Sequence, residues 1–170
     1  MLSLMSVLLA ATLGAPLAEP MTESALLDAP TRHVRTTDPA IKSLLKRGLR
    51  QSATFASLVA RLQQSDLIVY VEGIDRLPNA IEGRLLILPV PRGVRYVQIQ
   101  IRLRGALDDS IALLGHELQH AVEVAQASDV RDEKGLARLY QRIGVSGGAH
   151  VYDTAAAQQT GRIVRRELSS

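Results

Sequence analysis

Two histidines and a glutamate lie close together in the second half of the chain, where His116, Glu117 and His120 form an HExxH pattern. On an α-helix, residues four apart lie one above the other, about 6 Å apart along the axis. Both imidazoles can therefore reach one metal ion from the same side. Glu117 lies about 100° further round the helix, where it can contact a metal-bound water rather than the metal. Because two of the 4 histidines of the chain share this spacing, the pattern favours a metal site over two unrelated histidines on an amphipathic helix.

The metal site requires a helix over residues 111–124, and the sequence predicts one. Apolar residues recur on the face opposite the two histidines, as expected for a helix that packs against a core. They are Leu114, Leu118, Ala121, Val122 and Ala125. Asp108 or Asp109 precedes this run and is expected to cap the first turn. One face of the helix would then be buried while the opposite face binds the metal.

A catalytic zinc site has three protein ligands and one open position for water, so the chain must supply a third ligand. It contains no cysteine, which leaves histidine, aspartate and glutamate. Four residues are candidates: Glu123, Asp129, His150 and Asp153. Glu123 lies about one turn beyond His120 on the same straight helix, where convergence on one ion is difficult. We therefore expect Glu123 to orient a histidine instead.

The other three candidates come from later in the chain. Asp153 lies at the start of the last expected helix, where a rigid element could hold its carboxylate against the histidines; the alternative is that it only caps that helix. His150 lies in a glycine-rich loop and could reach the metal, or it could be an ordinary surface histidine. Asp129 more naturally ends the preceding helix. The residues alone leave the third ligand open between Asp153, His150 and Glu123.

These residues carry a resemblance to a known family. The stretch His116-Glu-Leu-Gln-His120 resembles the active-site helix of the zincin metallopeptidases. The stretch Tyr152-Asp-Thr-Ala-Ala-Ala, with Gly161 further on, resembles the region where gluzincin-like members supply an acidic third ligand from a second helix. From about Thr36 to Leu168 the chain resembles small, uncharacterised bacterial HExxH proteins with a short acidic-Thr motif before the final helix. The acid is typically Glu in those proteins, whereas it is Asp153 here.

The resemblance implies zinc-dependent peptide-bond hydrolysis, with one zinc ion (Zn2+) per chain held by His116, His120 and Asp153. Glu117 would act as general base on the zinc-bound water and then pass the proton to the leaving amine. The substrate would be a peptide or a protein. The chemistry of the residues supports the same mechanism independently of the resemblance.

Other roles and rival interpretations remain open. Tyr152 or His150 could stabilise the developing oxyanion. The main rival is a non-catalytic metal-binding module that docks partners, in which Glu117→Gln would leave function intact. A carboxylate-bridged di-metal bundle uses the Glu-x-x-His spacing of Glu117 and His120, but no other glutamate of the chain has a histidine three residues on.

The rest of the sequence predicts an α+β fold of zincin-like type, in which a sheet of about three strands packs with the HExxH helix and several further helices. Three runs rich in β-forming residues precede that helix: Leu67–Val71, Arg84–Leu88 and Val94–Arg104. Four further helices are expected to begin at Thr37 or Asp38, at Ser52, at Asp132 and at Tyr152.

The run from Val94 to Arg104 is the clearest strand, because apolar and polar residues alternate along it. Its apolar residues include Val97, Ile99, Ile101 and Leu103. It could be the edge strand on which an extended substrate docks by β-addition. It could equally be an ordinary amphipathic strand of the sheet.

Residues 1–18 are typical of a secretory signal, since an apolar run is followed by small residues. The run is too short, and too soon broken by Pro16, to span a membrane. We therefore expect an exported protein, periplasmic or secreted, with a linker over residues 19–36 and a metallopeptidase domain over residues 37–170. Because no basic residue precedes the apolar run, a buried N-terminal helix or a start codon assigned too far downstream are alternatives.

The charge of the chain argues against a nucleic-acid binder. The net charge is +3, and most of the basic residues are arginines. These are spread along the chain rather than clustered, and the chain has no Trp and only 1 Phe for base stacking. A solvated basic surface is the expected consequence.

Overall fold

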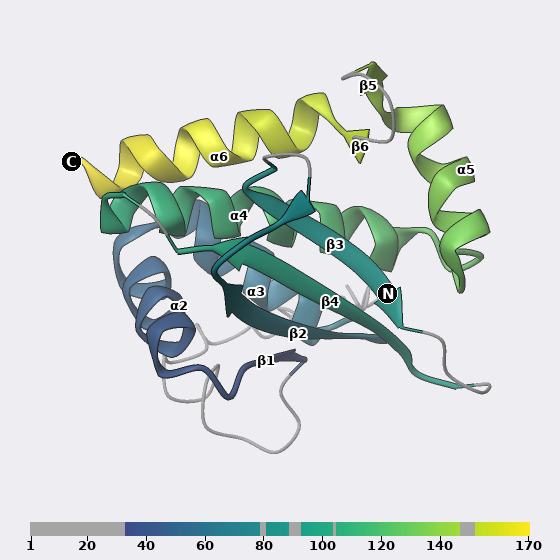
Figure 1. Cartoon of the computed structure of the whole chain (residues 1–170), viewed down its shortest axis with the longest axis horizontal. Helices are drawn as coiled ribbons and strands as arrows, with labels where there is room; N and C mark the ends of the chain where they lie inside the picture. Colours follow the sequence, from purple (N-terminus) through teal and green to yellow (C-terminus); the bar gives the residue numbers. More distant parts are fainter. Residues whose placement is uncertain (1–32, 79–80, 89–92, 104, 147–151) are drawn as a thin grey trace, which may run out of the picture.

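The computed structural model of the chain describes residues 33–78, 81–88, 93–103, 105–146 and 152–170. Within these ranges it is an α+β protein with five helices, a four-stranded mixed sheet and a two-stranded hairpin (Figure 1). The α+β class predicted from the sequence is therefore confirmed. The expected signal over residues 1–18 lies outside the described residues, as do His150 and the expected linker as far as residue 32.

The sheet has four strands rather than about three. In spatial order they are β1 (Val34–Arg35), β2 (Leu67–Ile74), β4 (Arg95–Arg102) and β3 (Gly83–Leu88). The first three run parallel, and β3 runs antiparallel to β4. The additional strand, β1, lies in the region expected to be a linker. Val34 is buried and the N–H of Val69 donates to the carbonyl of His33, so this short segment extends the sheet.

The predicted alternation of β4 is confirmed, but the idea that this strand forms an edge is wrong. Val97, Ile99 and Ile101 are each 0% exposed, while the residues between them are half-buried. The expectation that Leu103 belongs to the same buried face is wrong, because β4 ends at Arg102 and Leu103 is 38% exposed. β4 nevertheless lies between β2 and β3, and β3 forms the edge beside it. Alternation reports which face of a strand is buried; it carries no information on which strands are its neighbours.

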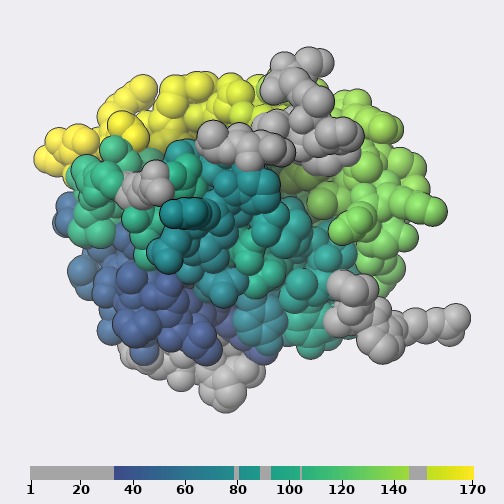
Figure 2. Space-filling model, in the orientation of Figure 1, coloured from purple at the N-terminus to yellow at the C-terminus, as the bar shows by residue number. Residues whose placement is uncertain are grey.

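The helices pack against one face of the sheet and against one another (Figure 1). They are α2 (Pro39–Gln51), α3 (Ala53–Gln63), α4 (Leu107–Gln126), α5 (Glu133–Ile143) and α6 (Ala155–Leu168). α4 carries the HExxH residues, and α6 lies along it. Figure 2 shows α6 in yellow along one edge of the molecule and α5 in light green at one end. No helix among the described residues combines the length and the apolar character needed to cross a membrane.

Side-chain caps define the start of most of these helices. Such caps are Asp38 for α2, Ser52 for α3, Asp132 for α5 and Thr154 for α6. The expected cap of α4 by Asp108 or Asp109 is wrong, because α4 begins after Ala106 and has no side-chain cap. Both aspartates lie inside its first turn, where Asp108 pairs with Arg47 at 2.7 Å and Asp109 with Arg165 at 2.6 Å. Negative charge in the first turn is still favourable for the helix dipole.

Candidate metal centre

The two imidazoles of α4 and the carboxylate of Asp153 converge on one point. Nε2 of His116 lies 3.1 Å from Nε2 of His120. Oδ1 of Asp153 lies 3.5 Å from the first nitrogen and 3.8 Å from the second. Around a tetrahedral zinc ion with bonds of about 2.0–2.2 Å, two ligand atoms are separated by roughly 3.4 Å. The three atoms therefore have the spacing that a single zinc ion requires.

Asp153 reaches the histidines from a short strand that precedes α6. It belongs to β6 (Tyr152–Asp153), which pairs with β5 (Val145–Ser146). The expectation that the last helix begins at Tyr152 is wrong, because Thr154 is its cap and its hydroxyl oxygen accepts the N–H of Ala157 at 3.0 Å. Since Thr154 caps the helix, the carboxylate of Asp153 is available for another role.

The carboxylate of Asp153 is held in place by its neighbours. Its Oδ1 accepts the N–H of Thr154 at 2.7 Å, and its Oδ2 accepts Nε2–H of Gln158 at 2.8 Å. A carboxylate oxygen has two lone pairs, so Oδ1 keeps capacity for a metal. These bonds orient the carboxylate towards His116 and His120 before any ion is bound.

Glu123 has the orienting position that the geometry of a straight helix predicts. Its Oε2 lies 3.0 Å from Nδ1 of His120, and its Oε1 accepts the hydroxyl of Thr154 at 2.7 Å. The bond at Nδ1 leaves Nε2 of His120 as the nitrogen that can ligate. A carboxylate behind a ligating histidine fixes the tautomer and the ring orientation and raises the basicity of the ligand.

Two glycines allow α4 and α6 to approach closely. A Cβ atom at Gly115 would lie 3.0 Å from Val164, and one at Gly161 would lie 3.4 Å from Cβ of His116. The first distance is short for a Cβ contact, so a side chain at Gly115 would require Val164 to shift, while a Cβ atom at Gly161 would already be in van der Waals contact with α4. The close approach keeps the start of α6, and hence Asp153, near the histidines of α4.

Glu117 lies beside the three candidate ligands and is almost fully buried. It is 4% exposed, and a Cβ atom at Gly83, the first residue of β3, would overlap its carboxylate. Burial raises the pKa of Glu117 to about 7; the charge of His120 acts to lower it and that of Asp153 to raise it. A carboxylate with a pKa near neutrality can both accept and return a proton at physiological pH.

The two histidines differ in their affinity for a proton. Burial and the charge of His120 lower the pKa of His116, with Asp153 and Glu123 opposing this effect. Burial acts to lower the pKa of His120 as well, but its hydrogen bond to Glu123 and the nearby carboxylates outweigh burial, so this pKa is raised. In the metal-free protein His120 therefore retains a proton more readily, and a metal must displace that proton to bind.

Among the described residues, the three converging side chains form a group that is close enough to hold a metal ion. Asp129, another candidate ligand from the sequence, lies exposed in the turn after α4, outside this group. Comparisons with protein-family models, with curated proteins and with solved structures find no match for this chain. A function must therefore be argued from the geometry of the site.

A cleft of about 790 Å³ opens beside the candidate ligands. The edge strand β3 lines it on one side, and Leu136, Ala137 and Tyr140 of α5 line it on another. Glu117 and the three candidate ligands also line this cleft. The site can therefore admit an extended molecule with the candidate metal position inside the cleft.

Tyr140 is a site residue that sequence reasoning missed. Its ring meets the ring of His120 edge-on, with 5.3 Å between the centroids, and the side chain lines the cleft. Burial raises the pKa of the phenol, as do the nearby carboxylates, so Tyr140 stays protonated at neutral pH. In the sequence it belongs to the apolar face of its helix, and only its type distinguishes it from a core residue. Of the expected oxyanion partners, His150 lies outside the described residues and Tyr152 is described only in its backbone.

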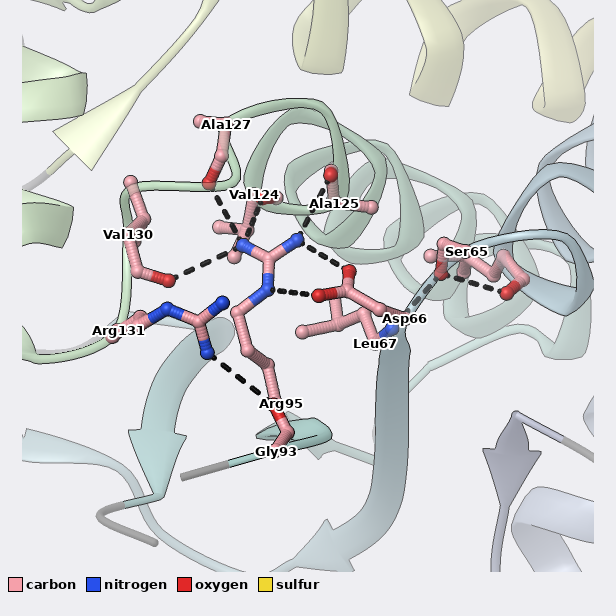
Figure 3. Close-up of polar contacts among 11 residues, drawn as sticks. Ser65, Asp66, Leu67, Gly93, Arg95, Val124, Ala125, Ala127, Val130 and Arg131 are labelled. Carbon is pink, nitrogen blue, oxygen red and sulfur yellow. Dashed lines mark hydrogen bonds and ion pairs between the residues drawn. The ribbon is translucent and has the colours of Figure 1, made fainter. Parts of the chain in front are cut away.

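Arg95, at the start of β4, fixes the other end of the HExxH helix (Figure 3). It is 4% exposed and pairs with Asp66 at 2.6 Å and 3.0 Å, which lowers the pKa of Asp66. Its guanidinium also donates to the carbonyls of Val124, Ala125, Ala127 and Val130 at 2.8, 2.9, 2.8 and 3.2 Å. The last carbonyls of a helix have no partner within the helix, and a cation there is favourable for the helix dipole. Arg95 thus anchors the end of α4 immediately after Glu123.

Proposed function

We propose that this chain is a zinc-dependent peptidase of the zincin type that holds one zinc ion through His116, His120 and Asp153. The observation that carries the proposal is the spacing of these three side chains, which suits a tetrahedral ion. Two imidazoles and one carboxylate are also a donor set that zinc accepts while one position stays open. A buried glutamate beside them and a cleft in front of them supply the other requirements of a hydrolytic site.

When bound, zinc supplies Lewis acidity, which acidifies a coordinated water and polarises the carbonyl of the scissile bond. Glu117 accepts the proton of the attacking water and delivers it to the leaving amine. To accept the proton of the water, Glu117 must be ionised, and a nearby cation favours the ionised form. To deliver the proton to the leaving amine, Glu117 must be protonated, and its buried position favours that form. Tyr140 is our candidate donor to the developing oxyanion, because its hydroxyl is kept protonated and its side chain lines the same cleft.

A peptide substrate would bind along β3 as an added strand. Among the described strands β3 pairs only with β4, and its residues from Gly83 to Ile87 line the cleft. An edge of this kind offers backbone donors and acceptors to an extended peptide. Leu136 and Ala137 line the same cleft, so a substrate side chain next to α5 would be apolar.

The test is cleavage of an unbiased peptide mixture by the zinc-loaded chain, with Glu117→Gln as the matched variant, analysed by mass spectrometry. Gln has the shape of Glu but cannot act as a base. We expect cleavage by the wild type and a loss of about a hundredfold or more in the variant. A zinc-loaded wild type that cleaves nothing, even over long incubation, would instead favour the non-catalytic metal-binding module.

A further inference from the structure

A second hollow continues the cleft on the other side of His116. It has a volume of about 420 Å³ and shares Glu82, Leu113 and His116 with the cleft. Its remaining wall comes from β4, from the first half of α4 and from α6. Any chain that lies along β3 past the candidate metal position would reach this hollow at the Glu82 end of the strand.

Three arginines from two different elements line this hollow. They are Arg102 at the end of β4 and Arg162 and Arg165 on α6. Two carboxylates also line it, and each is already paired: Glu82 with Arg102 at 2.9 Å and Asp109 with Arg165 at 2.6 Å. The described lining therefore contains one cation more than it contains carboxylates.

Arg162 supplies the cation that no carboxylate neutralises. Within the described part of the chain its side chain bonds to the neutral amide of Gln159, at 2.9 and 3.3 Å, and is in no ion pair. Nearby, Nε of Arg102 is buried and has no hydrogen-bond partner among the described residues. The lining thus carries one positive charge that no described carboxylate neutralises, and Arg102, whose buried Nε lacks a partner among the described residues, contributes its side chain to the same lining.

We propose that this hollow is a substrate subsite for a carboxylate, with Arg162 as its main specificity determinant and Arg102 beside it. The planar guanidinium matches a carboxylate with two parallel N–H donors, which favours this anion over a neutral amide of the same shape. The carboxylate belongs either to an Asp or Glu side chain or to the C-terminus of the peptide. This inference rests on the proposed peptidase function, since it assigns the hollow to the same substrate.

The first test compares paired peptide sets on the zinc-loaded full chain. One set has Asp or Glu at each position in turn and the other has Asn or Gln, and each set is made with a free and with an amidated C-terminus. We expect the carboxylate peptides to be cleaved about tenfold better in kcat/KM. A preference for Asp or Glu at one position identifies a side chain as the source of the carboxylate. A preference for the free over the amidated C-terminus identifies the C-terminus as the source.

Arg162→Gln is the decisive variant, and Arg166→Gln is its matched control. Arg166 is exposed on the same helix and does not line the hollow. We expect Arg162→Gln to cleave acid and amide peptides with equal kcat/KM, so that the preference for carboxylates is lost, and Arg166→Gln to keep the preference. Equal cleavage of acid and amide peptides by the wild type, or a preference that survives Arg162→Gln, would overturn the subsite.

A binding measurement separates failure of the subsite from failure of the peptidase function. Fluorescein-labelled peptides of both sets are titrated by anisotropy into the full chain with Glu117→Gln, alone and combined with Arg162→Gln. Tighter binding of the carboxylate set that disappears with Arg162→Gln supports the subsite even if the wild type cleaves no peptide. Equal binding of both sets overturns the subsite even if the wild type is an active peptidase.

Discussion

Thr154 donates a hydrogen bond of 2.7 Å to Glu123 across the contact between α6 and α4. The same hydroxyl oxygen caps α6 through Ala157, and the same carboxylate contacts the ring of His120. One side chain therefore joins the start of one helix to a candidate ligand on the other. Because Asp153 directly precedes Thr154, this link also determines where the third candidate ligand lies.

The link predicts that Thr154→Val weakens metal binding. Valine keeps the shape of threonine but removes the hydroxyl, so both Glu123 and the cap of α6 lose a partner. We expect zinc affinity to fall about 10–100-fold and the free energy of unfolding to fall by about 1–2 kcal/mol. A competitive zinc titration and urea unfolding measure these effects. Thr154→Ser keeps the hydroxyl and should stay near the wild type; equal affinities for the Val and Ser variants would contradict the proposed link.

Arg95 should contribute strongly to stability although it lies far from the candidate ligands. Arg95→Met removes the donor to four carbonyls in the last turn of α4 and in the segment that follows it, and it removes the ion-pair partner of Asp66. We expect a loss of about 3 kcal/mol in the free energy of unfolding, measured in urea. Arg131→Met is the control, since Arg131 makes one exposed bond of 3.3 Å to the carbonyl of Gly93. If the free energy of unfolding falls by the same small amount in both variants, Arg95 does not anchor the end of α4.

Gly83 should be needed for activity because it lies against Glu117. A Cβ atom there would overlap the carboxylate, so Gly83→Ala must displace the proposed general base. We expect peptidase activity to fall by about a hundredfold while zinc is retained, because the three atoms nearest to the added methyl group all belong to Glu117. Retention of full activity with unchanged zinc content would show that the position of Glu117 tolerates the shift and is less constrained than we argue.

Glu117 gives the metal-free protein a defined dependence on pH. Its pKa rises from 4.5 to about 7 on folding, so the folded state binds the proton more tightly than the unfolded state. The raised pKa of Glu117 therefore adds to the free energy of unfolding below about pH 4.5, and this addition is lost as the pH rises through about 7. Between about pH 4.5 and pH 7, the free energy of unfolding of the metal-free wild type should fall relative to that of Glu117→Gln. The fall should be on the order of 3 kcal/mol at most. Parallel curves of unfolding free energy against pH for the two proteins would contradict the burial of Glu117.

Local patterns in the sequence predicted the features that depend on local geometry. The spacing of His116 and His120 predicted a shared face, and the structure brings both Nε2 atoms together. The rise of a straight helix predicted that Glu123 would orient a histidine, and it contacts His120. Alternation predicted the buried face of β4. Each of these features depends on residues within a few positions of one another.

Features that depend on distant pairing could not be predicted in the same way. The place of β4 inside the sheet is set by its pairing with both β2 and β3, which alternation does not report. Arg95 donates to backbone carbonyls 29 to 35 residues away. Every residue has a backbone carbonyl, so the sequence does not indicate which of them Arg95 contacts. Tyr140 approaches His120 only because α5 folds back beside the cleft.

The most direct test of the metal centre is the zinc content of the purified chain, measured by elemental analysis for the wild type, Asp153→Ala and Asp129→Ala. Asp129 is the matched control because it is exposed and lies outside the converging group. We predict one zinc per chain in the wild type and in Asp129→Ala, and loss of zinc in Asp153→Ala. A wild type that takes up no zinc when zinc is supplied, or an Asp153→Ala chain that keeps it at full affinity, would contradict the proposed centre.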